Sequence, residues 1–227
     1  MTLILNVKSL SLKDGLININ HLLVKTGIHV FLGKNGSGKT TLLKFFATIL
    51  NENPSDYSLN GKDVNKLSLK EISECFSFLP QNLNKNPSLD VDEFIQLLPQ
   101  KKSPSFREKE RLLEYFDLKK LLSKKTTHIS DGQWKLVQIV RLFLQDTKVF
   151  VLDEPECFLD IINIEKLKTL IEDKRDEKIF LISSHNLSFV NSFKKRTLFL
   201  INKNSLSPLE KNTNTGLKED ILKRFRA

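Results

Sequence analysis

The stretch GKNGSGKTTLLKFF, residues 33–46, places three of the chain's eight glycines within six residues. A lysine, two threonines and an apolar run follow them. Glycine in or beside a helix costs about 1 kcal/mol relative to alanine, so this concentration indicates a specific backbone requirement. The preceding residues 27–33, GIHVFLG, are typical of a buried strand, and residues 40–50 repeat apolar side chains at helical spacing. The sequence therefore predicts a strand, a glycine-rich loop and a helix in direct succession.

The loop from Gly33 to Thr40 matches the pattern G-x-x-x-x-G-K-[ST] in the strand–loop–helix context that this pattern requires. Glycines let successive backbone N–H groups point inward at phosphate oxygens, and the start of the helix adds its dipole. Lys39 is expected to reach the β- and γ-phosphates of a nucleotide, and the Thr40 hydroxyl to ligate Mg²⁺. The residues predicted to bind nucleotide in this segment are Gly33, Asn35, Gly36, Ser37, Gly38, Lys39, Thr40 and Thr41.

Apolar runs that end in polar residues recur at 148–155 and 178–185, with a helix-spaced segment between them. Strand, helix and strand in this order predict a parallel sheet with right-handed crossovers. Alternating residues near the N-terminus and the pair Asn60–Gly61, a hairpin signal, predict a small antiparallel β region. In residues 90–125, apolar side chains recur at helical spacing. The predicted fold class is α/β, a P-loop NTPase core with a parallel sheet, a small antiparallel β subdomain and an inserted helical subdomain.

The run KVFVLDEP, residues 148–155, ends in two adjacent carboxylates. Asp153, at the end of the predicted strand, can hold Mg²⁺, usually through water. The next residue, Glu154, can accept a proton from an attacking water molecule. Two solvated acids at a strand end are the ordinary alternative, but a phosphate-binding motif in the same chain favours the catalytic interpretation.

Three further segments carry polar residues in an ordered pattern. The tetrapeptide SDGQ, residues 130–133, begins an amphipathic helix 23 residues before Asp153. Gln81 follows a predicted strand in FLPQN, and His185 lies 31 residues after Glu154. At these residues the sequence resembles the ATP-binding cassette (ABC) family, whose signature is usually written LSGGQ.

The resemblance covers nearly the whole chain and implies roles for these residues. Gln81 would contact the metal or the attacking water and His185 the γ-phosphate, so that with Glu154 they form the predicted catalytic set. The resemblance also implies a dimer, in which the P-loop of one subunit and the signature of the other clamp one ATP, and Asp160 matches an aspartate at that interface. The further residues predicted to bind nucleotide are Ser130, Gly132, Gln133 and Asp160, and the predicted metal ligands are Thr40, Gln81 and Asp153.

The chain departs from the family pattern in two places. The family usually stacks an aromatic ring on adenine upstream of the P-loop, whereas residues 1–30 contain no Phe, Tyr or Trp, and Leu12 or Lys13 is expected there instead. Loss of a stacked ring can cost about 1–3 kcal/mol, so weak discrimination between ATP and GTP is predicted. Asp131 replaces a glycine of the signature, and we expect its carboxylate to point away from the nucleotide.

The length of 227 residues suits a single nucleotide-binding domain, with 1–81 and 131–227 as the ATP-binding core and 82–130 as the helical subdomain. We find no apolar run of membrane length and no signal peptide, so a cytoplasmic location is expected. The two cysteines, Cys75 and Cys157, are far apart and are expected to be reduced thiols. The net charge of +9 suits an ordinary lysine-rich surface or contact with anionic lipid, and no nucleic-acid partner is expected.

These features favour the ATPase subunit of a membrane ABC transporter, working as a dimer, in the simplest case a homodimer, on the cytoplasmic face of the membrane. A separate permease would supply the membrane spans, and the helical insert would dock it. Apolar residues near Gln81 are expected at that contact, namely Phe76, Phe78, Leu83 and Phe94. The SDGQ tetrapeptide and LDI at 159–161 are similar to ATPases of iron–siderophore, haem and vitamin B12 importers.

Three alternatives stay open from the sequence. The first is a small exporter ATPase, because the chain itself does not contact the transported compound. The second is a soluble ABC ATPase without a permease, such as one in iron–sulfur cluster assembly. The third is a binding module that no longer hydrolyses ATP, which the presence of Gln81, Glu154 and His185 disfavours.

Overall fold

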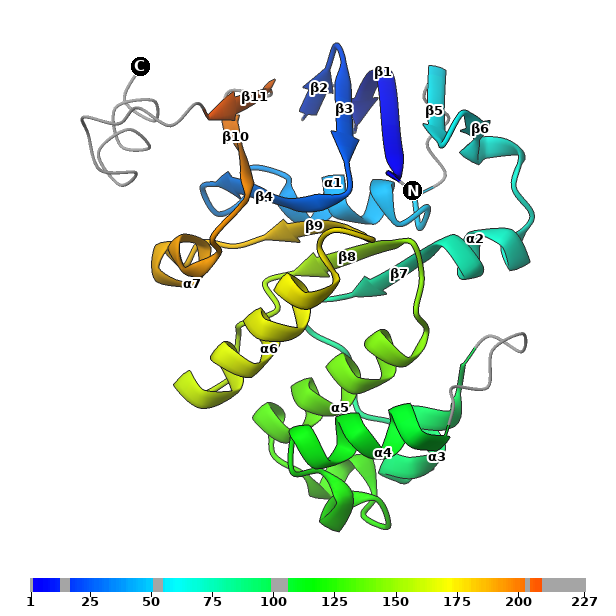
Figure 1. The fold of residues 1–227 in the computed structure, drawn as a ribbon, viewed down its shortest axis with the longest axis vertical. Coiled ribbons are helices and arrows are strands. Elements are labelled where there is room, and N and C mark those ends of the chain that lie inside the picture. Colours follow the sequence, from blue (N-terminus) through cyan, green and yellow to red (C-terminus); the bar gives the residue numbers. More distant parts are fainter. Residues whose placement is uncertain (1, 13–16, 51–54, 99–105, 203–204, 210–227) are drawn as a thin grey trace.

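The computed structural model describes residues 2–12, 17–50, 55–98, 106–202 and 205–209 (Figure 1). The strands are β1 (Ile4–Leu12), β2 (Ile17–Ile19), β3 (Leu22–Lys25), β4 (Gly27–Gly33), β5 (Ser55–Leu59), β6 (Lys62–Asp63), β7 (Phe76–Leu79), β8 (Val149–Asp153), β9 (Ile179–Ser183), β10 (Thr197–Asn202) and β11 (Ser205–Leu209). The α-helices are α1 (Lys39–Phe46), α2 (Leu69–Cys75), α3 (Val91–Gln96), α4 (Phe106–Tyr115), α5 (Asp131–Leu144), α6 (Ile161–Lys174) and α7 (Leu187–Ser192). Short 3₁₀ turns cover Val64–Lys66, Lys119–Leu121 and Thr126–His128.

The strands form one curled sheet in the order β6-β5-β1-β2-β11-β10-β4-β9-β8-β7, with β3 paired to β1. The pairs β10–β4, β4–β9, β9–β8 and β8–β7 are parallel, whereas β1 is antiparallel to β2, β3 and β5. Asn60 and Gly61, with φ of 51° and 77°, join β5 to β6 and so have the left-handed backbone that a two-residue hairpin turn favours. The predicted parallel core and antiparallel β region are confirmed.

Two hydrophobic clusters pack against opposite faces of the parallel strands, because successive residues of a strand point to opposite sides. On β8, Val149 and Val151 belong to the cluster that contains α1, while Phe150 and Leu152 belong to the cluster that contains α5 and α6. All residues of β8 are buried, as expected for a parallel strand covered on both faces. Packing on both faces therefore fixes the backbone at the C-terminal end of β8, where Asp153 lies.

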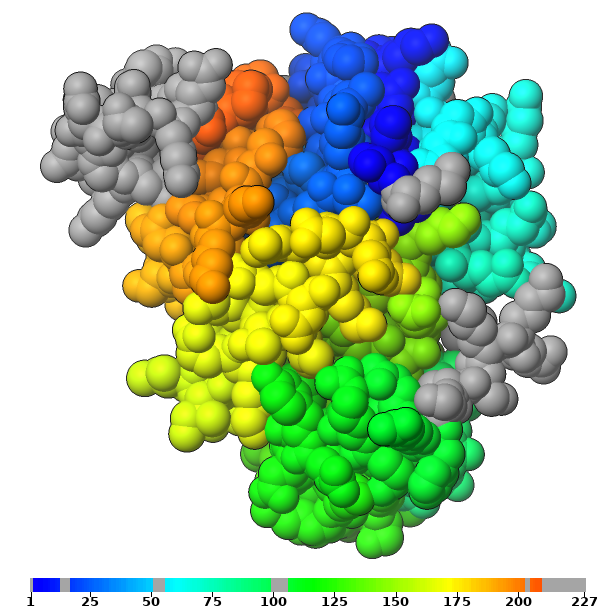
Figure 2. Space-filling model, in the orientation of Figure 1, coloured from blue at the N-terminus to red at the C-terminus, as the bar shows by residue number. Residues whose placement is uncertain are grey.

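Helices α3 and α4 lie at the end of the molecule opposite to β1, β2 and β5 (Figure 1). In the space-filling view, the segment that contains α4 forms a rounded green lobe below α6 (Figure 2). Apolar residues of α3 and α4 join the cluster of α5, and the rings of Phe94 and Trp134 have their centroids 4.5 Å apart. The helix-rich character predicted for residues 90–125 is confirmed in the described parts of that segment.

Three helices begin at capping boxes that are encoded locally in the sequence. Ser68 begins α2 and Asp90 begins α3, each paired with a glutamate three residues later. Ser130 begins α5 in the same way, with Gln133 as its reciprocal partner. Each box satisfies backbone N–H groups that a helix start leaves without partners. The sequence around the signature thus determines where α5 begins.

Candidate nucleotide site

The glycine-rich loop connects β4 to α1, as predicted. Gly36 and Gly38 have φ of 78° and 93°, and Gly38 is the N-cap of α1. A side chain at Gly33 would place its Cβ 2.3 Å from Ser37 Oγ and 3.2 Å from the Ile201 carbonyl oxygen. Two glycines therefore supply a left-handed backbone and the third supplies close approach, which explains their concentration in this loop.

The ammonium of Lys39 lies inside this loop. It donates to the carbonyl oxygens of Gly33 at 2.9 Å and Lys34 at 3.1 Å, and the residue is buried. Burial lowers the pKa of Lys39, while the carboxylates of Glu154 and Asp153 oppose that shift. The loop thus encloses the Lys39 ammonium, which can exchange these carbonyl oxygens for phosphate oxygens as its hydrogen-bond acceptors.

Thr40, in the first turn of α1, meets the end of β8. Its Oγ1 donates to Asp153 Oδ2 at 2.7 Å, while Ser183, at the end of β9, donates to the other carboxylate oxygen of Asp153. In the described residues no cluster of three or more His, Cys, Asp or Glu side chains forms a protein-only metal site. The adjacent hydroxyl and carboxylate oxygens are donors that Mg²⁺ prefers, and this ion is commonly bound by one or two protein groups together with phosphate oxygens. Thr40 and Asp153 therefore fit the predicted ion.

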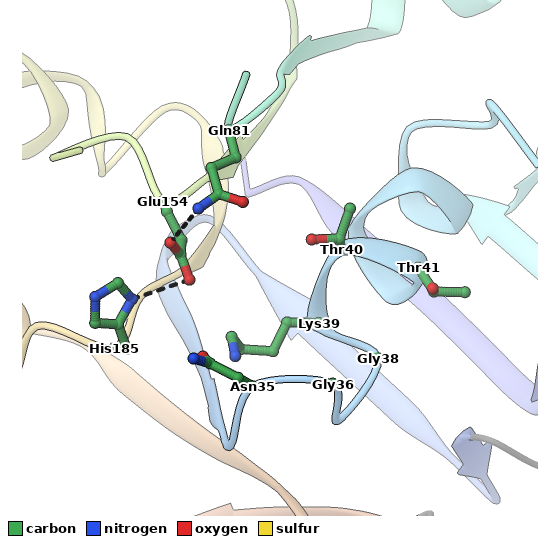
Figure 3. Close-up of a pocket in the computed structure, with 9 residues that line it drawn as sticks. All are labelled: Asn35, Gly36, Gly38, Lys39, Thr40, Thr41, Gln81, Glu154 and His185. Atoms are coloured by element: carbon green, nitrogen blue, oxygen red, sulfur yellow. Dashed lines mark hydrogen bonds and ion pairs between the residues drawn. The ribbon is translucent and has the colours of Figure 1, made fainter. Parts of the chain in front are cut away.

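Glu154 is contacted by both of the other side chains predicted to be catalytic. Gln81 Nε2 donates to Glu154 Oε2 at 2.8 Å, and His185 Nδ1 lies 3.0 Å from Glu154 Oε1. Figure 3 shows Gln81 and His185 approaching the carboxylate from two sides, opposite the P-loop. The backbone N–H of Glu154 donates to Ser183 Oγ at 3.0 Å, and the residue has a φ of 44°. Two segments that are distant from Glu154 in sequence thus converge on its carboxylate.

These residues face a common cavity of about 490 Å³ (Figure 3). Strand ends β4, β7, β8 and β9 and the start of α1 contribute to it, so it lies at the C-terminal edge of the parallel strands, where α/β folds bind ligands. The lining residues are Asn35, Gly36, Gly38, Lys39, Thr40, Thr41, Gln81, Glu154 and His185.

The remaining residues predicted to bind nucleotide do not line this cavity. Ser130 and Gln133 form the capping box of α5, and Asp160 is the N-cap of α6, accepting from the Asn163 N–H at 2.8 Å. A Cβ at Gly132 would lie 2.8 Å from the carbonyl oxygen of Phe158. Asp131 forms an ion pair with Lys85 at 2.8 Å.

Two buried ionisable residues near the cavity were missed by the sequence analysis. Lys135, 2% exposed, donates to the carbonyl oxygens of Pro80 at 3.0 Å and Gln81 at 3.1 Å, and burial lowers its pKa to about 8. Glu156, 5% exposed, is hydrogen-bonded to Ser184 Oγ, and burial raises its pKa. The available signal was a lysine within the apolar pattern of residues 132–145, because an amphipathic helix normally exposes its lysines.

Two residues that the sequence analysis singled out can be placed in the structure. Leu12 is fully buried in the cluster that contains α1, so its side chain is not available to stack on a base; Lys13 lies outside the described residues. The Sγ of Cys157 lies 3.5 Å from Glu154 Oε2, and burial raises the pKa of the thiol to about 11. A thiol with a raised pKa is a poor nucleophile, in line with a packing role.

Comparison with known protein families gives a match to the ABC transporter family over residues 16–156, more than half of the chain. The chain belongs to this family. It is therefore an ABC-type ATP-binding and ATP-hydrolysing cassette, and its recognition from the signature and its spacing is confirmed. Within the parts of the chain that the structure describes, no helix has the length and apolar character needed to cross a membrane.

Individual relatives agree with this assignment. A probable siderophore transport system ATP-binding protein of Bacillus subtilis is 28% identical over 192 residues, covering 79% of this chain and 70% of that protein. The solved structure of an ATP-binding subunit of an ABC transporter matches with a TM-score of 0.84 at 22% identity, covering 99% of this chain and 100% of that one. A dimeric ATP-binding cassette in a post-hydrolysis state, bound to ADP and phosphate, matches with a TM-score of 0.73 at 19% identity, covering 93% of this chain and 100% of that one. The two structures share the fold of this chain.

Proposed function

We propose that this chain is the ATP-hydrolysing subunit of a membrane ABC transporter, which closes with a second nucleotide-binding subunit around ATP and drives a separate permease. The observation that carries the proposal is the convergence of Gln81 and His185 on Glu154, across one cavity from Lys39. This arrangement combines a phosphate-binding loop with a carboxylate held for proton transfer.

Glu154 is proposed as the general base. Its carboxylate would accept a proton from the water that attacks the γ-phosphate, since a base must lie within hydrogen-bond reach of that water. Gln81 and His185 contact its two oxygens and so orient the carboxylate before the nucleotide is engaged. In the reaction Gln81 would position the water and His185 would contact the γ-phosphate. Lys39 would stabilise negative charge on the phosphates.

Mg²⁺ is proposed as the accompanying ion, held by Thr40 and Asp153. Gln81, the third predicted ligand, contacts Glu154 in this structure and would have to turn its amide oxygen toward the ion. When bound with ATP it would neutralise phosphate charge and polarise the transferred group. The direct hydrogen bond between Thr40 and Asp153, 2.7 Å long, already brings the two protein oxygens together. Asp153 keeps its position through Ser183, which contacts its other oxygen.

A dimer is proposed because the signature and the P-loop do not meet within one chain. Ser130, Gly132, Gln133 and Asp160 do not line the cavity that contains Lys39, so a second subunit would bring these residues to the nucleotide. Every motif is present in this chain, with Asp131 in place of one signature glycine, which favours two copies of this chain. The related cassette bound to ADP and phosphate was solved as a dimer, which supports the same arrangement.

The permease is proposed to dock near the segment that follows Gln81, on the helical part of a single nucleotide-binding domain in which residues 82–130 form the insert. Two of the apolar residues expected at this contact, Phe76 and Phe94, are buried in the hydrophobic clusters, so that part of the expectation is wrong. Leu83, 39% exposed, is accessible and lines a second cavity of about 300 Å³ beside α5.

Peripheral attachment to the cytoplasmic face of a membrane would then come through the permease. The described part of the basic segment 101–125 carries local ion pairs rather than a field of unpaired lysines. Arg111 pairs with Glu108, and Lys119 pairs with Glu110 and Glu114. The observation favours an ordinary solvated helix surface over a lipid-binding patch.

An iron–siderophore, haem or cobalamin-type compound is the proposed cargo, supported by the siderophore system to which the chain is similar. The runner-up is a soluble ABC ATPase without a permease, as in iron–sulfur cluster assembly. The two differ in the partner that the closed subunit holds, a polytopic membrane protein in one and a soluble protein in the other.

The test uses Glu154→Gln, which keeps the size of the side chain and removes the base. Glu177→Gln, at an exposed residue between α6 and β9, is the matched control. With ATP and Mg²⁺, we expect Glu154→Gln to lose turnover, to dimerise, and to retain a polytopic membrane protein in pull-downs from solubilised membranes of the native cell. Full turnover in Glu154→Gln would refute the assignment of the base, and capture of soluble partners alone would favour the runner-up.

A further inference from the structure

Helix α5 carries a lysine that is almost inaccessible to solvent. Lys135 is 2% exposed and lies on the second turn of the helix that Ser130 caps. Its ammonium donates to two consecutive carbonyl oxygens, those of Pro80 at 3.0 Å and Gln81 at 3.1 Å. Burying an ammonium group is costly unless it is hydrogen-bonded or paired, so the position of Lys135 depends on this stretch of backbone.

The acceptor residue Gln81 is also the residue whose side chain reaches the carboxylate of Glu154, at 2.8 Å. Lys135, the backbone of Gln81, the amide of Gln81 and Glu154 thus form a continuous chain of polar contacts. Burial has the largest effect on the pKa of Lys135 and lowers it. The carboxylates of Asp153, Glu156 and Glu154 oppose that shift and favour the charged ammonium.

Other contacts between α5 and the same segment do not involve Gln81. Trp134 Nε1 donates to the carbonyl oxygen of Leu83 at 2.7 Å, and Lys85 pairs with Asp131 and donates to the Ile129 carbonyl oxygen. The segment after β7 is therefore attached to the start of α5 at several points. Among these described contacts, the attachment through Lys135 is the one that ends on Gln81, the residue that contacts Glu154.

We propose that Lys135 is a positioning residue for hydrolysis: it fixes the backbone of Gln81 to helix α5, so that the amide of Gln81 and the signature at the start of α5 move as one unit. The inference rests on the proposed function, because it assigns Gln81 a part in the reaction. Beyond that function, the inference is that a displacement of α5 moves Gln81 as well and so changes the hydrogen bond between the Gln81 amide and the Glu154 carboxylate.

The test is a double-mutant cycle between Lys135→Met and Gln81→Ala, with Trp134→Phe as the matched control that removes a hydrogen bond to Leu83 instead. We expect Lys135→Met to lower kcat about tenfold or more, since small misplacement near reacting groups can cost up to about a hundredfold. The dissociation constant for ATP should stay within about twofold, because Lys135 is not among the residues that line the cavity of Lys39. Lys135→Met should add little in a Gln81→Ala background.

A conservative variant and hydrogen exchange provide two further measurements. Lys135→Gln retains a donor and should give a kcat between those of wild type and Lys135→Met. Hydrogen exchange at the N–H groups of residues 81–83 should rise in Lys135→Met, and this readout does not require turnover. If wild type does not hydrolyse ATP but exchange rises, the proposed function fails while the attachment stands.

Three results would overturn the inference. The first is multiplicative losses of kcat in the double variant, which would show that Lys135 acts independently of Gln81. The second is an equal loss of kcat in Trp134→Phe. The third is a parallel fall of melting temperature, ATP affinity and kcat in Lys135→Met, which would reduce Lys135 to a structural role.

Discussion

Ser130 caps helix α5 and is also predicted to bind nucleotide, and substitutions can distinguish the two roles. Its Oγ accepts from the Gln133 N–H at 3.2 Å, and Gln133 Oε1 accepts from the Ser130 N–H at 3.1 Å. This is the capping box of α5. In the closed dimer we expect the same hydroxyl to contact the γ-phosphate of the nucleotide bound by the other subunit.

The magnitude of the capping role follows from the geometry. Ser130→Ala removes the acceptor and should cost about 1 kcal/mol, within a range of roughly 0.5–2 kcal/mol. For a domain of this size that corresponds to a fall in melting temperature of about 2–4 °C per kcal/mol. Ser130→Asn preserves the cap, and Ser130→Gly should cost only a few tenths of a kcal/mol. Neither residue carries a hydroxyl.

The assay combines thermal denaturation of the nucleotide-free subunit with steady-state ATP turnover. We expect Ser130→Asn and Ser130→Gly to keep the melting temperature within about 1 °C while losing turnover by about tenfold or more. Ser130→Thr, which keeps both the cap and the hydroxyl, is the matched control. Wild-type turnover in both Ser130→Asn and Ser130→Gly would show that the hydroxyl only caps the helix. An unchanged melting temperature in Ser130→Ala would refute the capping argument.

Three further outcomes are expected. Gly132→Ala places a Cβ 2.8 Å from the Phe158 carbonyl oxygen and should lower the unfolding free energy by roughly 1–3 kcal/mol, despite the better helix propensity of alanine; chemical denaturation would contradict this by showing equal or higher stability. Tyr57→Phe removes the buried hydrogen bond of 2.7 Å to the Phe46 carbonyl oxygen and should cost about 1–3 kcal/mol in the same assay, where a loss near zero would be contrary. Burial raises the pKa of Glu156 above its usual 4.5, so the unfolding free energy of the wild type should fall as the pH rises from 4.5 through the pKa of the folded state. Glu156→Gln should make the urea midpoint of unfolding less dependent on pH. Parallel pH profiles of the two proteins would contradict this prediction.

The fold was predictable where local pattern and tertiary environment agree. The P-loop, the strands that end at Asp153 and Ser183, and the cap at Ser130 follow from short-range rules of periodicity and capping. Two local features were missed. Helix α2, residues Leu69–Cys75, has no buried residue and hence little apolar periodicity. The alternating residues near the N-terminus predicted an antiparallel region but not its division into β2 and β3, which pair with different parts of β1.

Within the site, motifs located Lys39, Gln81, Glu154 and His185, but their mutual contacts depend on sheet order. Strands β7, β8 and β9 are neighbours in the sheet, and this brings residues more than a hundred positions apart to one carboxylate. The assignment of single roles stays a prediction. The apolar pattern around Lys135 was a signal for its burial, but its partners could not be identified from sequence, because the chain segment after β7 supplies them from more than fifty residues away.

The hydrophobic cluster that joins α3 and α4 to α5 has a consequence for exchange of parts between related proteins. Phe94 and Trp134 pack against each other across the boundary at residue 130, with their ring planes tilted by 54°, and Leu112 and Val140 belong to the same cluster. A chimaera that took only residues 82–130 from a relative would combine two half-cores with different shapes. A transfer that extends through the end of α5, at Leu144, keeps Phe94 together with Trp134, and its remaining seam is the contact of Phe143 with Phe150 of β8, 5.3 Å between ring centroids. Recombination between such genes is therefore expected to tolerate crossovers near residue 130 poorly.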